Sequence, residues 1–310
     1  MTAKLSPKPR IIVVVGPTSS GKSALAVALA KKFNGEVISA DSRQIYKGMN
    51  LGTGKVTKFE MKGVPHHLLD IVSPKRTFSA GQYRRRAAAV IRSILRKRKL
   101  PILAGGTGFY IDALLERAAL PEVKPNPVLR RELSARTTEA LFRELQKRDP
   151  RRAAIIDRAN RPRLIRALEI VLTTKRPVPT PLSPAELAER SPYDALVIGI
   201  NPGKEVLHRK ISKRFAIRLR RGMVQEVRRL HEVHGISWQR LDDLGLDYRY
   251  VSRYLRGMIT KEEMRAEIEK ENFRYAKRQM TWFKRDPSIH WIKYPKDAFA
   301  LAVEFLAQEK

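Results

Sequence analysis

The 310-residue chain contains no cysteine. This absence excludes disulfides, thiolate metal sites and cysteine nucleophiles, so any catalysis must use other groups. Acidic residues are also scarce: 31 Asp and Glu oppose 63 Lys and Arg, which gives a formal net charge of +32. An excess of that size concentrates polyanions near the protein, and nucleic acid is the commonest polyanion. A basic proteome or thermal adaptation would give the same excess, so the charge alone leaves both explanations open.

Long apolar runs are missing too. No segment approaches the roughly 20 apolar residues that span a bilayer, and the first ten residues, MTAKLSPKPR, are too short and polar for a secretory signal. We therefore expect no membrane contact and a cytoplasmic protein, with a monomer as the default. Hydrophobic residues make up 43% of the chain, enough for one large core or two smaller ones.

A glycine-rich loop follows the first apolar segment. The β-branched run IIVVV (Ile11–Val15) is typical of a strand buried on both faces of a parallel sheet. GPTSSGKS (Gly16–Ser23) comes next, and apolar residues then recur at helical spacing through Lys22–Phe33. Strand, glycine loop and helix thus follow in the order that a P-loop requires.

Strands and helices continue to alternate. Glu36–Ser39 and Leu100–Ala104 predict two further strands, Ala80–Lys99 predicts a basic amphipathic helix, and Tyr193–Ile200 predicts a late strand. The alternation predicts an α/β fold, a P-loop NTPase-like doubly wound parallel sheet with ligands at the carboxyl ends of its strands. Residues 121–192 are proline-punctuated and helical. We expect a core from 1–120 and 193–310, ending in basic helices, and an inserted helical domain at 121–192.

The loop itself predicts a phosphate site. Backbone N–H groups and the positive end of the following helix dipole surround a phosphate in such loops. Lys22 adds a positive charge, and the Ser23 hydroxyl suits Mg2+. The sequence therefore predicts binding of a di- or triphosphate group.

The acid that holds the metal in P-loop ATPases and GTPases is hard to find here. The segments PILAGGTG and LVIGIN end without one, and Asp70 follows two histidines that make a poor buried strand. Asp41 in VISADS is the clearest strand-end acid. It fits a base or metal-linked group at a reacting centre, or a carboxylate that caps the next turn.

Other groups have two interpretations each. Thr107 in GGTG could hydrogen-bond a substrate or satisfy a local backbone group. Arg163 and Arg166 lie three apart on one helix and fit either a solvated basic face or phosphate contacts. His66 and His67 lack a suitable nearby acid for zinc, so we expect them to pack and to hydrogen-bond the loop.

The segment NFRYAKRQMTWFKRD alternates aromatic and basic residues. Tyr275, Trp282 and Phe283 are expected to pack in a core rather than to stack on bases. Their basic neighbours would reach solvent or a polyanion.

In this order, the motifs resemble the tRNA dimethylallyltransferase family, also called tRNA isopentenyltransferases. A P-loop followed by D-S-x-x-x-Y and then G-G-T-G-x-Y is not a pattern of ordinary kinases. The lack of cysteines for the zinc finger of eukaryotic members favours a bacterial-type enzyme. The matching segments, which extend to about residue 285, are GPTSSGKS, ISADSRQIYKGMNLGTGK, PHHLLDI, PILAGGTGFYIDALL, RPRLIRALEI and YAKRQMTWF.

The resemblance implies transfer of a dimethylallyl group from dimethylallyl diphosphate to N6 of the adenine 3′ of the anticodon, with Mg2+ and with the tRNA anticodon stem-loop as partner. Asp41 would take the N6 proton, Thr107 would position the adenine, and Lys22 would stabilise the leaving pyrophosphate. The residues implied for the diphosphate are Gly16, Pro17, Thr18, Ser19, Ser20, Gly21, Lys22, Ser23 and Arg214, with Ser23 also on Mg2+. Those implied for tRNA are Asp41, Ser42, Arg43, Gln44, Thr107, Arg130, Pro162, Arg163, Leu164, Ile165 and Arg166.

The sequence departs from the family's Gly-Tyr-Arg-Gln or Gly-Tyr-Arg-Glu segment. Here it reads GLDYRY, with Asp247 and Tyr250 in the flanking places, so only Tyr248 and Arg249 match. No tRNA contact is assigned to this segment.

Three alternatives stay open. A P-loop kinase or NTPase would turn over nucleotide. The lack of an acid at the ends of PILAGGTG and LVIGIN disfavours this alternative. An adenylate isopentenyltransferase would share the loop and Asp41, but the charge of +32 and the helical insertion disfavour a free-nucleotide acceptor. An RNA-binding module with a degenerate P-loop would not need the intact Lys22, Ser23 and Asp41.

Overall fold

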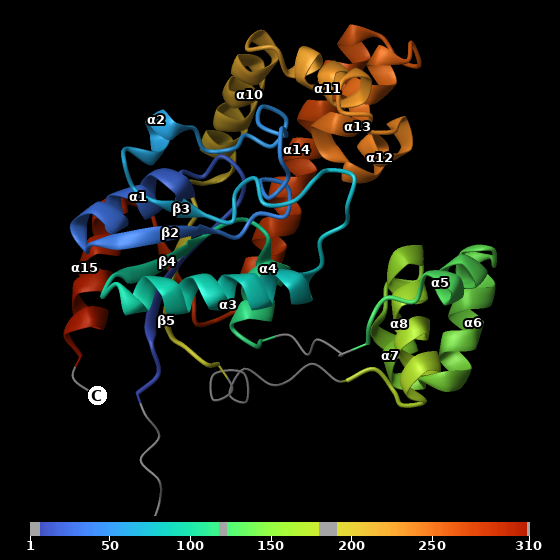
Figure 1. Cartoon of the computed structure of the whole chain (residues 1–310), viewed down its shortest axis with the longest axis horizontal. Coiled ribbons are helices and arrows are strands. Elements are labelled where there is room, and N and C mark those ends of the chain that lie inside the picture. Colours follow the sequence, from blue (N-terminus) through green and yellow to red (C-terminus); the bar gives the residue numbers. More distant parts are fainter. Residues whose placement is uncertain (1–6, 118–122, 180–190, 309–310) are drawn as a thin grey trace, which may run out of the picture. The chain divides into compact units, whose positions relative to one another are not determined.

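The computed structural model describes residues 7–117, 123–179 and 191–308. The chain divides into two compact units, Met1–Leu115 with Ser191–Lys310, and Glu116–Arg190. The first unit holds a sheet with covering helices, whereas the described part of the second contains helices and no strand (Figure 1).

A six-stranded, all-parallel sheet forms the centre of the first unit, in the order β3-β2-β4-β1-β5-β6. β1 lies between β4 and β5, and its apolar run from Ile11 to Val15 is fully buried, as expected for a strand covered on both faces. The predicted α/β class is confirmed. The strands are β1 (Arg10–Val15), β2 (Gly35–Ser39), β3 (His66–His67), β4 (Leu100–Ala104), β5 (Asp194–Ile200) and β6 (His290–Ile292).

Helices cover both faces of this sheet. α1 (Lys22–Lys32) and α15 (Pro295–Ala307) share an apolar core with Ile12 and Val14 of β1. α3 (Ala80–Arg96) packs against β2 and β4, and the alternation of side chains along a strand assigns it to the other face. A capping box begins α3: the Ser79 hydroxyl accepts from the Gln82 amide, and the Gln82 side chain accepts from the Ser79 amide. The short helices α2 (Lys58–Met61) and α4 (Gly108–Leu114) complete this part.

The C-terminal helices build a second core within the first unit. Phe215, Met223 and Tyr248 pack there against Ile45 and Met49 from the loop after β2. The basic helices expected at the end of the core include a break at Gly222, whose φ of 95° favours glycine. α14 runs from this core back toward the sheet (Figure 1). These helices are α10 (Lys204–Arg220), α11 (Met223–Glu232), α12 (Trp238–Leu244), α13 (Leu246–Leu255) and α14 (Lys261–Phe283).

The second unit has its own apolar core, which includes Leu133, Leu145, Leu164 and Leu168. Each helix in the described part of this unit begins with a residue whose side chain accepts backbone N–H bonds, and three of them carry proline in the first turn, as the proline punctuation of the sequence predicts. The helices are α5 (Pro127–Ser134), α6 (Thr138–Arg148), α7 (Pro150–Ile155) and α8 (Arg161–Thr174).

Two strands differ from expectation. The histidine-rich segment, judged a poor buried strand, forms β3, a half-buried edge strand of two residues that pairs with β2. β6 at the opposite edge was not predicted, because its three residues carry too short an alternation to be recognised. Over the described ranges, no helix is both long enough and apolar enough to cross a membrane.

Candidate active site

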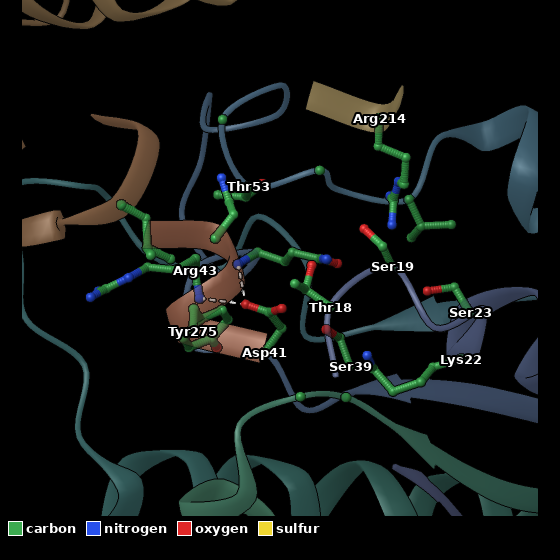
Figure 2. A pocket seen from close by; sticks show the side chains of 18 of the residues that line it. Thr18, Ser19, Lys22, Ser23, Ser39, Asp41, Arg43, Thr53, Arg214 and Tyr275 are labelled. Atoms are coloured by element: carbon green, nitrogen blue, oxygen red, sulfur yellow. Dashed lines mark hydrogen bonds between the residues drawn. The ribbon is translucent and has the colours of Figure 1, made fainter. Parts of the chain in front are cut away.

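A pocket in the first unit lies at the carboxyl ends of β1, β2 and β4 (Figure 2). Because parallel strands end at one edge of the sheet, loops that are distant in sequence meet there. Helices α10 and α14 close the pocket from the other side. Its polar lining includes Thr18, Ser19, Lys22 and Ser23 after β1, Asp41, Arg43 and Gln44 after β2, Arg214 and Arg218 on α10, and Tyr275 and Gln279 on α14.

The loop after β1 has a backbone that requires its glycines. Gly16 and Gly21 have φ angles of 142° and 103°, which L side chains rarely adopt. A Cβ on Gly16 would also lie 2.7 Å from the carbonyl oxygen of Ile200. Gly21 is the N-cap of α1, so the amino end of α1 opens on the pocket. Pro17 and Ser20 are buried behind the loop and do not line the pocket.

Two cations enter the pocket at a cost in solvation. The Lys22 ammonium donates to the carbonyl of Pro17 at 2.6 Å, and burial lowers the pKa of Lys22 from 10.5 to about 7, with Asp41 raising it and Arg214 lowering it further. Burial also lowers the pKa of Arg214, as does the neighbouring Arg218. An anion bound between Lys22 and Arg214 would offset both effects.

Asp41 follows β2 and lines the same pocket (Figure 2). Its Oδ1 accepts from the amides of Arg43 at 2.8 Å and Gln44 at 3.3 Å, so the carboxylate does cap the next turn. Its Oδ2 makes no hydrogen bond within the described part of the chain. One oxygen therefore fixes the carboxylate while the other stays available, so the two interpretations of Asp41 are compatible.

Thr107 lies next to this loop rather than on the pocket wall. Its Oγ1 accepts from the amide of Ser42 at 3.0 Å and donates to the Ser42 hydroxyl at 3.3 Å. The Thr107 amide donates to Ala40 at 3.1 Å. Thr107 thus ties the loop after β4 to the loop that bears Asp41. Tyr275, expected to be only a core residue, lines the pocket beside Asp41, and burial raises the pKa of its hydroxyl.

Gln279 on α14 joins two of the pocket loops, and sequence reasoning did not single it out. Its Oε1 accepts from the Thr18 amide at 2.7 Å, and its Nε2 donates to the Gly106 carbonyl at 2.8 Å. The Thr18 amide, implied for diphosphate, is therefore already used within the protein. The only sequence signal for Gln279 is its place in YAKRQMTWF.

A buried carboxylate holds the loop over the pocket. Glu226 on α11 accepts from the amides of Asn50, Leu51 and Gly52 at 3.0, 2.7 and 3.1 Å and from the Tyr248 hydroxyl at 2.8 Å. Four donors to one carboxylate fix residues 50–52. The adjoining residues 52–54 line the pocket.

Asp247, at the altered family position, supports this loop from behind. Its Oδ2 forms an ion pair with Arg218 at 2.7 Å, and its Oδ1 accepts from Asn272 at 2.9 Å. Burial raises the pKa of Asp247, while Arg218 opposes that rise. Arg218 in turn donates to the carbonyls of Leu51 and Gly52. The altered segment therefore packs within the unit.

The residues implied for tRNA in the second unit differ in exposure. Pro162 and Arg163 are exposed at the start of α8, and Ile165 is half-buried. Leu164 is fully buried in the core of the unit, so its side chain is not on a surface that RNA could touch. Arg130 and Arg166 are partly exposed and both bind the carboxylate of Glu169, which the sequence reasoning did not single out.

The remaining sequence candidates are internal contacts. His66 Nδ1 pairs with the carbonyl of Val64 at 2.9 Å, and His67 Nε2 pairs with Glu36 at 2.8 Å. Asp70 binds Lys55 at 2.5 Å. Across the described ranges, no group of three or more His, Asp and Glu side chains could hold a metal ion.

Comparison with known proteins identifies the family of the chain. The chain matches the family model described as IPP transferase over residues 44–286. It is 39% identical over 304 residues to tRNA dimethylallyltransferase 1 of Geotalea daltonii, covering 97% of this chain and 96% of that protein. It is 40% identical over 292 residues to tRNA dimethylallyltransferase of Caldanaerobacter subterraneus, covering 91% of each.

A solved structure has the same fold. The crystal structure of tRNA delta(2)-isopentenylpyrophosphate transferase from Staphylococcus epidermidis superimposes with a TM-score of 0.72 at 36% identity and covers 97% of this chain and 100% of that chain. The family model and the relatives' alignments extend over both units. This chain therefore belongs to the IPP transferase family.

Proposed function

We propose that the chain transfers a dimethylallyl group from dimethylallyl diphosphate to N6 of the adenine 3′ of the anticodon in tRNA, releasing pyrophosphate. The observation that carries this proposal is the convergence of Lys22 and Arg214 with the free Oδ2 of Asp41 on the wall of one pocket. The names of the relatives at about 40% identity favour the same reaction.

Lys22, Arg214 and the amino end of α1 would bind the diphosphate. In the reaction the C1–O bond of the allyl diphosphate breaks, and negative charge grows on the departing pyrophosphate. Cations that already lie on the pocket wall, with Lys22 held by the Pro17 carbonyl, would stabilise that charge with little reorganisation. This is the largest contribution that we assign to the chain.

Asp41 would act as the base. The new bond forms between adenine N6 and C1, and the N6 proton passes to Oδ2 of Asp41. The amine is a poor nucleophile, so a carboxylate helps most as the bond forms. The amides of Arg43 and Gln44 hold Oδ1 and so aim the other oxygen. Through its bonds to Ser42, Thr107 would hold this loop in place for the adenine.

Mg2+ fits the donors that are present. Ser23 offers a hydroxyl at the pocket wall, and the lack of a protein cluster among the described residues suits an ion that takes most ligands from phosphate oxygens and water. When bound, the ion would neutralise part of the diphosphate charge. Ser23 is the protein ligand that we propose.

The tRNA would be bound by both units. The target base must leave the anticodon stack to reach the pocket, so protein contacts have to replace that stacking. Arg43 and Gln44 lie at the pocket, while Arg163 and the partly exposed Arg130 and Arg166 belong to the second unit. The charge of +32 supports a polyanionic acceptor.

Acceptor choice tests the proposal directly. Purified protein, Mg2+ and radiolabelled dimethylallyl diphosphate are incubated with unmodified tRNA, AMP or ATP. Of these three acceptors, we expect only tRNA to gain label. A control tRNA in which guanine replaces the adenine 3′ of the anticodon should gain none. Label in AMP or ATP but not in tRNA would identify an adenylate isopentenyltransferase instead.

A further inference from the structure

A carboxylate lies in the apolar core of the second unit. Glu169 on α8 has no exposed surface, and its neighbours in sequence, Leu168 and Ile170, are buried as well. A charged group in such a place needs bonded partners, since an unpaired buried charge is strongly destabilising. Glu169 has several such partners, and most of them are arginine nitrogens.

Two arginines share this carboxylate. Arg130 Nε donates to Oε1 at 2.8 Å and its Nη2 donates to Oε2 at 2.7 Å, a bidentate pair. Arg166 Nη1 donates to Oε2, and its Nη2 donates to the carbonyl of Val123 at 3.0 Å. The Asn126 amide donates to Oε1 at 2.7 Å. Burial raises the pKa of Glu169, but these bonds outweigh it and hold the pKa below its usual range.

Both arginines remain partly accessible. Their side chains are 42% and 34% exposed, whereas that of Glu169 is 0% exposed. Arg130 donates to Glu169 through Nε and Nη2, so its Nη1 does not bond this carboxylate. Arg166 donates through Nη1 and Nη2, so its Nε is not used in these bonds. The guanidinium groups of these partly exposed side chains therefore have fixed planes and keep N–H donors that Glu169 does not use.

Stability alone does not explain this cluster. Buried ion clusters of this kind are often no more stabilising than apolar residues of similar volume. We propose that Glu169 is a positioning residue: it holds Arg130 and Arg166 as one rigid pair whose spare N–H groups bind RNA backbone phosphate. This inference rests on the proposed function, because it takes tRNA as the polyanion.

Removing the negative charge of Glu169 distinguishes positioning of the two arginines from simple electrostatic attraction between the protein and RNA. Glu169→Gln removes a negative charge, so attraction alone predicts tighter RNA binding and a steeper salt dependence. Positioning predicts the opposite, because the released guanidinium groups lose their common orientation. We expect KM for tRNA to rise about tenfold while KM for dimethylallyl diphosphate and kcat stay unchanged.

Glu139→Gln is the matched control. Glu139 lies in the same unit and pairs with Arg143, but both side chains are 69% exposed. The same charge change there should leave tRNA affinity unchanged or slightly higher. Filter binding with tRNA from 50 to 300 mM salt measures the slope of log Kd against log salt concentration, and we expect Glu169→Gln to reduce that slope by the equivalent of one to two phosphate contacts.

Arg130→Lys covers the case in which Glu169→Gln does not fold. Lysine keeps the charge but cannot make the bidentate bond, so positioning predicts weaker tRNA binding and attraction predicts no change. Arg143→Lys is its control. Wild-type affinity and slope in folded Glu169→Gln or Arg130→Lys would overturn the inference, as would tighter binding. Since label in tRNA would still appear in that case, the proposed function would survive; label in AMP alone would overturn the function itself.

Discussion

Gln279 on α14 and Gly106 after β4 lie in direct contact: the glutamine Nε2 donates to the glycine carbonyl at 2.8 Å. The same side chain accepts from the Thr18 amide of the P-loop at 2.7 Å. A Cβ on Gly106 would be only 2.1 Å from that Nε2. One buried amide therefore sets the spacing between the glycine loop after β1 and the loop that adjoins Thr107.

Gln279→Ala should impair both stability and turnover. It leaves the Thr18 amide and the Gly106 carbonyl without this partner, so we expect the free energy of unfolding to fall by about 1–3 kcal/mol. The two loops would also lose the side chain that holds them at a fixed spacing, so kcat/KM should fall about 10- to 100-fold. Chemical denaturation and steady-state kinetics measure the two effects.

Exposed Gln239 provides the control, since its side chain donates to Asp243 on the surface. Gln239→Ala should change neither quantity. Gly106→Ala should be harmful alone and less harmful when combined with Gln279→Ala, because the second substitution removes the contacting atom. Additive losses in that double variant would show that the two residues do not act together.

Diphosphate binding should take up a proton. Above pH 7 most of Lys22 is neutral, because burial lowers its pKa to about 7. A bound diphosphate favours the charged ammonium, so binding at pH 8 should take up close to one proton. The affinity for dimethylallyl diphosphate should therefore be highest where Lys22 is charged, below pH 7, and should fall as the pH rises above 7.

Calorimetry in two buffers of different ionisation enthalpy measures this uptake with dimethylallyl diphosphate and Mg2+. Lys22→Arg keeps its charge at every pH used, so its uptake at pH 8 should vanish. Equal proton uptake in both proteins would mean that the proton goes to the ligand or to another residue.

Arg214→Met should separate binding from stability. Burial lowers the pKa of Arg214, so folding disfavours its charge, and removing that charge should not reduce the free energy of unfolding. KM for dimethylallyl diphosphate should rise about 10- to 100-fold.

Arg240 is the control and should give the reverse result, because it donates to the carbonyls of Pro74 and Arg76. Arg240→Met should destabilise the protein with an unchanged KM, and a loss of stability in Arg214→Met would contradict the prediction.

The sequence predicts the parts of the site that follow short chain segments. Strand, glycine loop and helix lie within Arg10–Lys32, and Asp41 directly follows a buried strand, so local pattern is enough to find them. Gln279 acts 261 residues away from Thr18, and Glu226 acts 176 residues away from Asn50. Their roles depend on tertiary packing, which no local pattern encodes.

The same limit applies to charge. The sequence allows Arg166 a solvated basic face or a phosphate contact, yet Glu169 binds both Arg166 and Arg130 because α5 packs on α8. Helical spacing alone would suggest the i,i+3 pair of Arg166 with Glu169, but not that the acid is buried. Asp247 likewise looked like a lost match, and only the fold shows that Arg218 pairs with it.

Asp41→Asn should remove the base that we propose and leave the loop intact. The amide oxygen of Asn can still accept from Arg43 and Gln44, so the turn and the free energy of unfolding should change little. Because the N6 proton loses its acceptor, the single-turnover rate should fall about 10²- to 10⁴-fold. The Kd for tRNA should stay within about twofold. Rapid-quench measurements with labelled dimethylallyl diphosphate and filter binding test both. A wild-type rate would assign the proton to another group, and a proportional loss of tRNA affinity would assign Asp41 to binding instead.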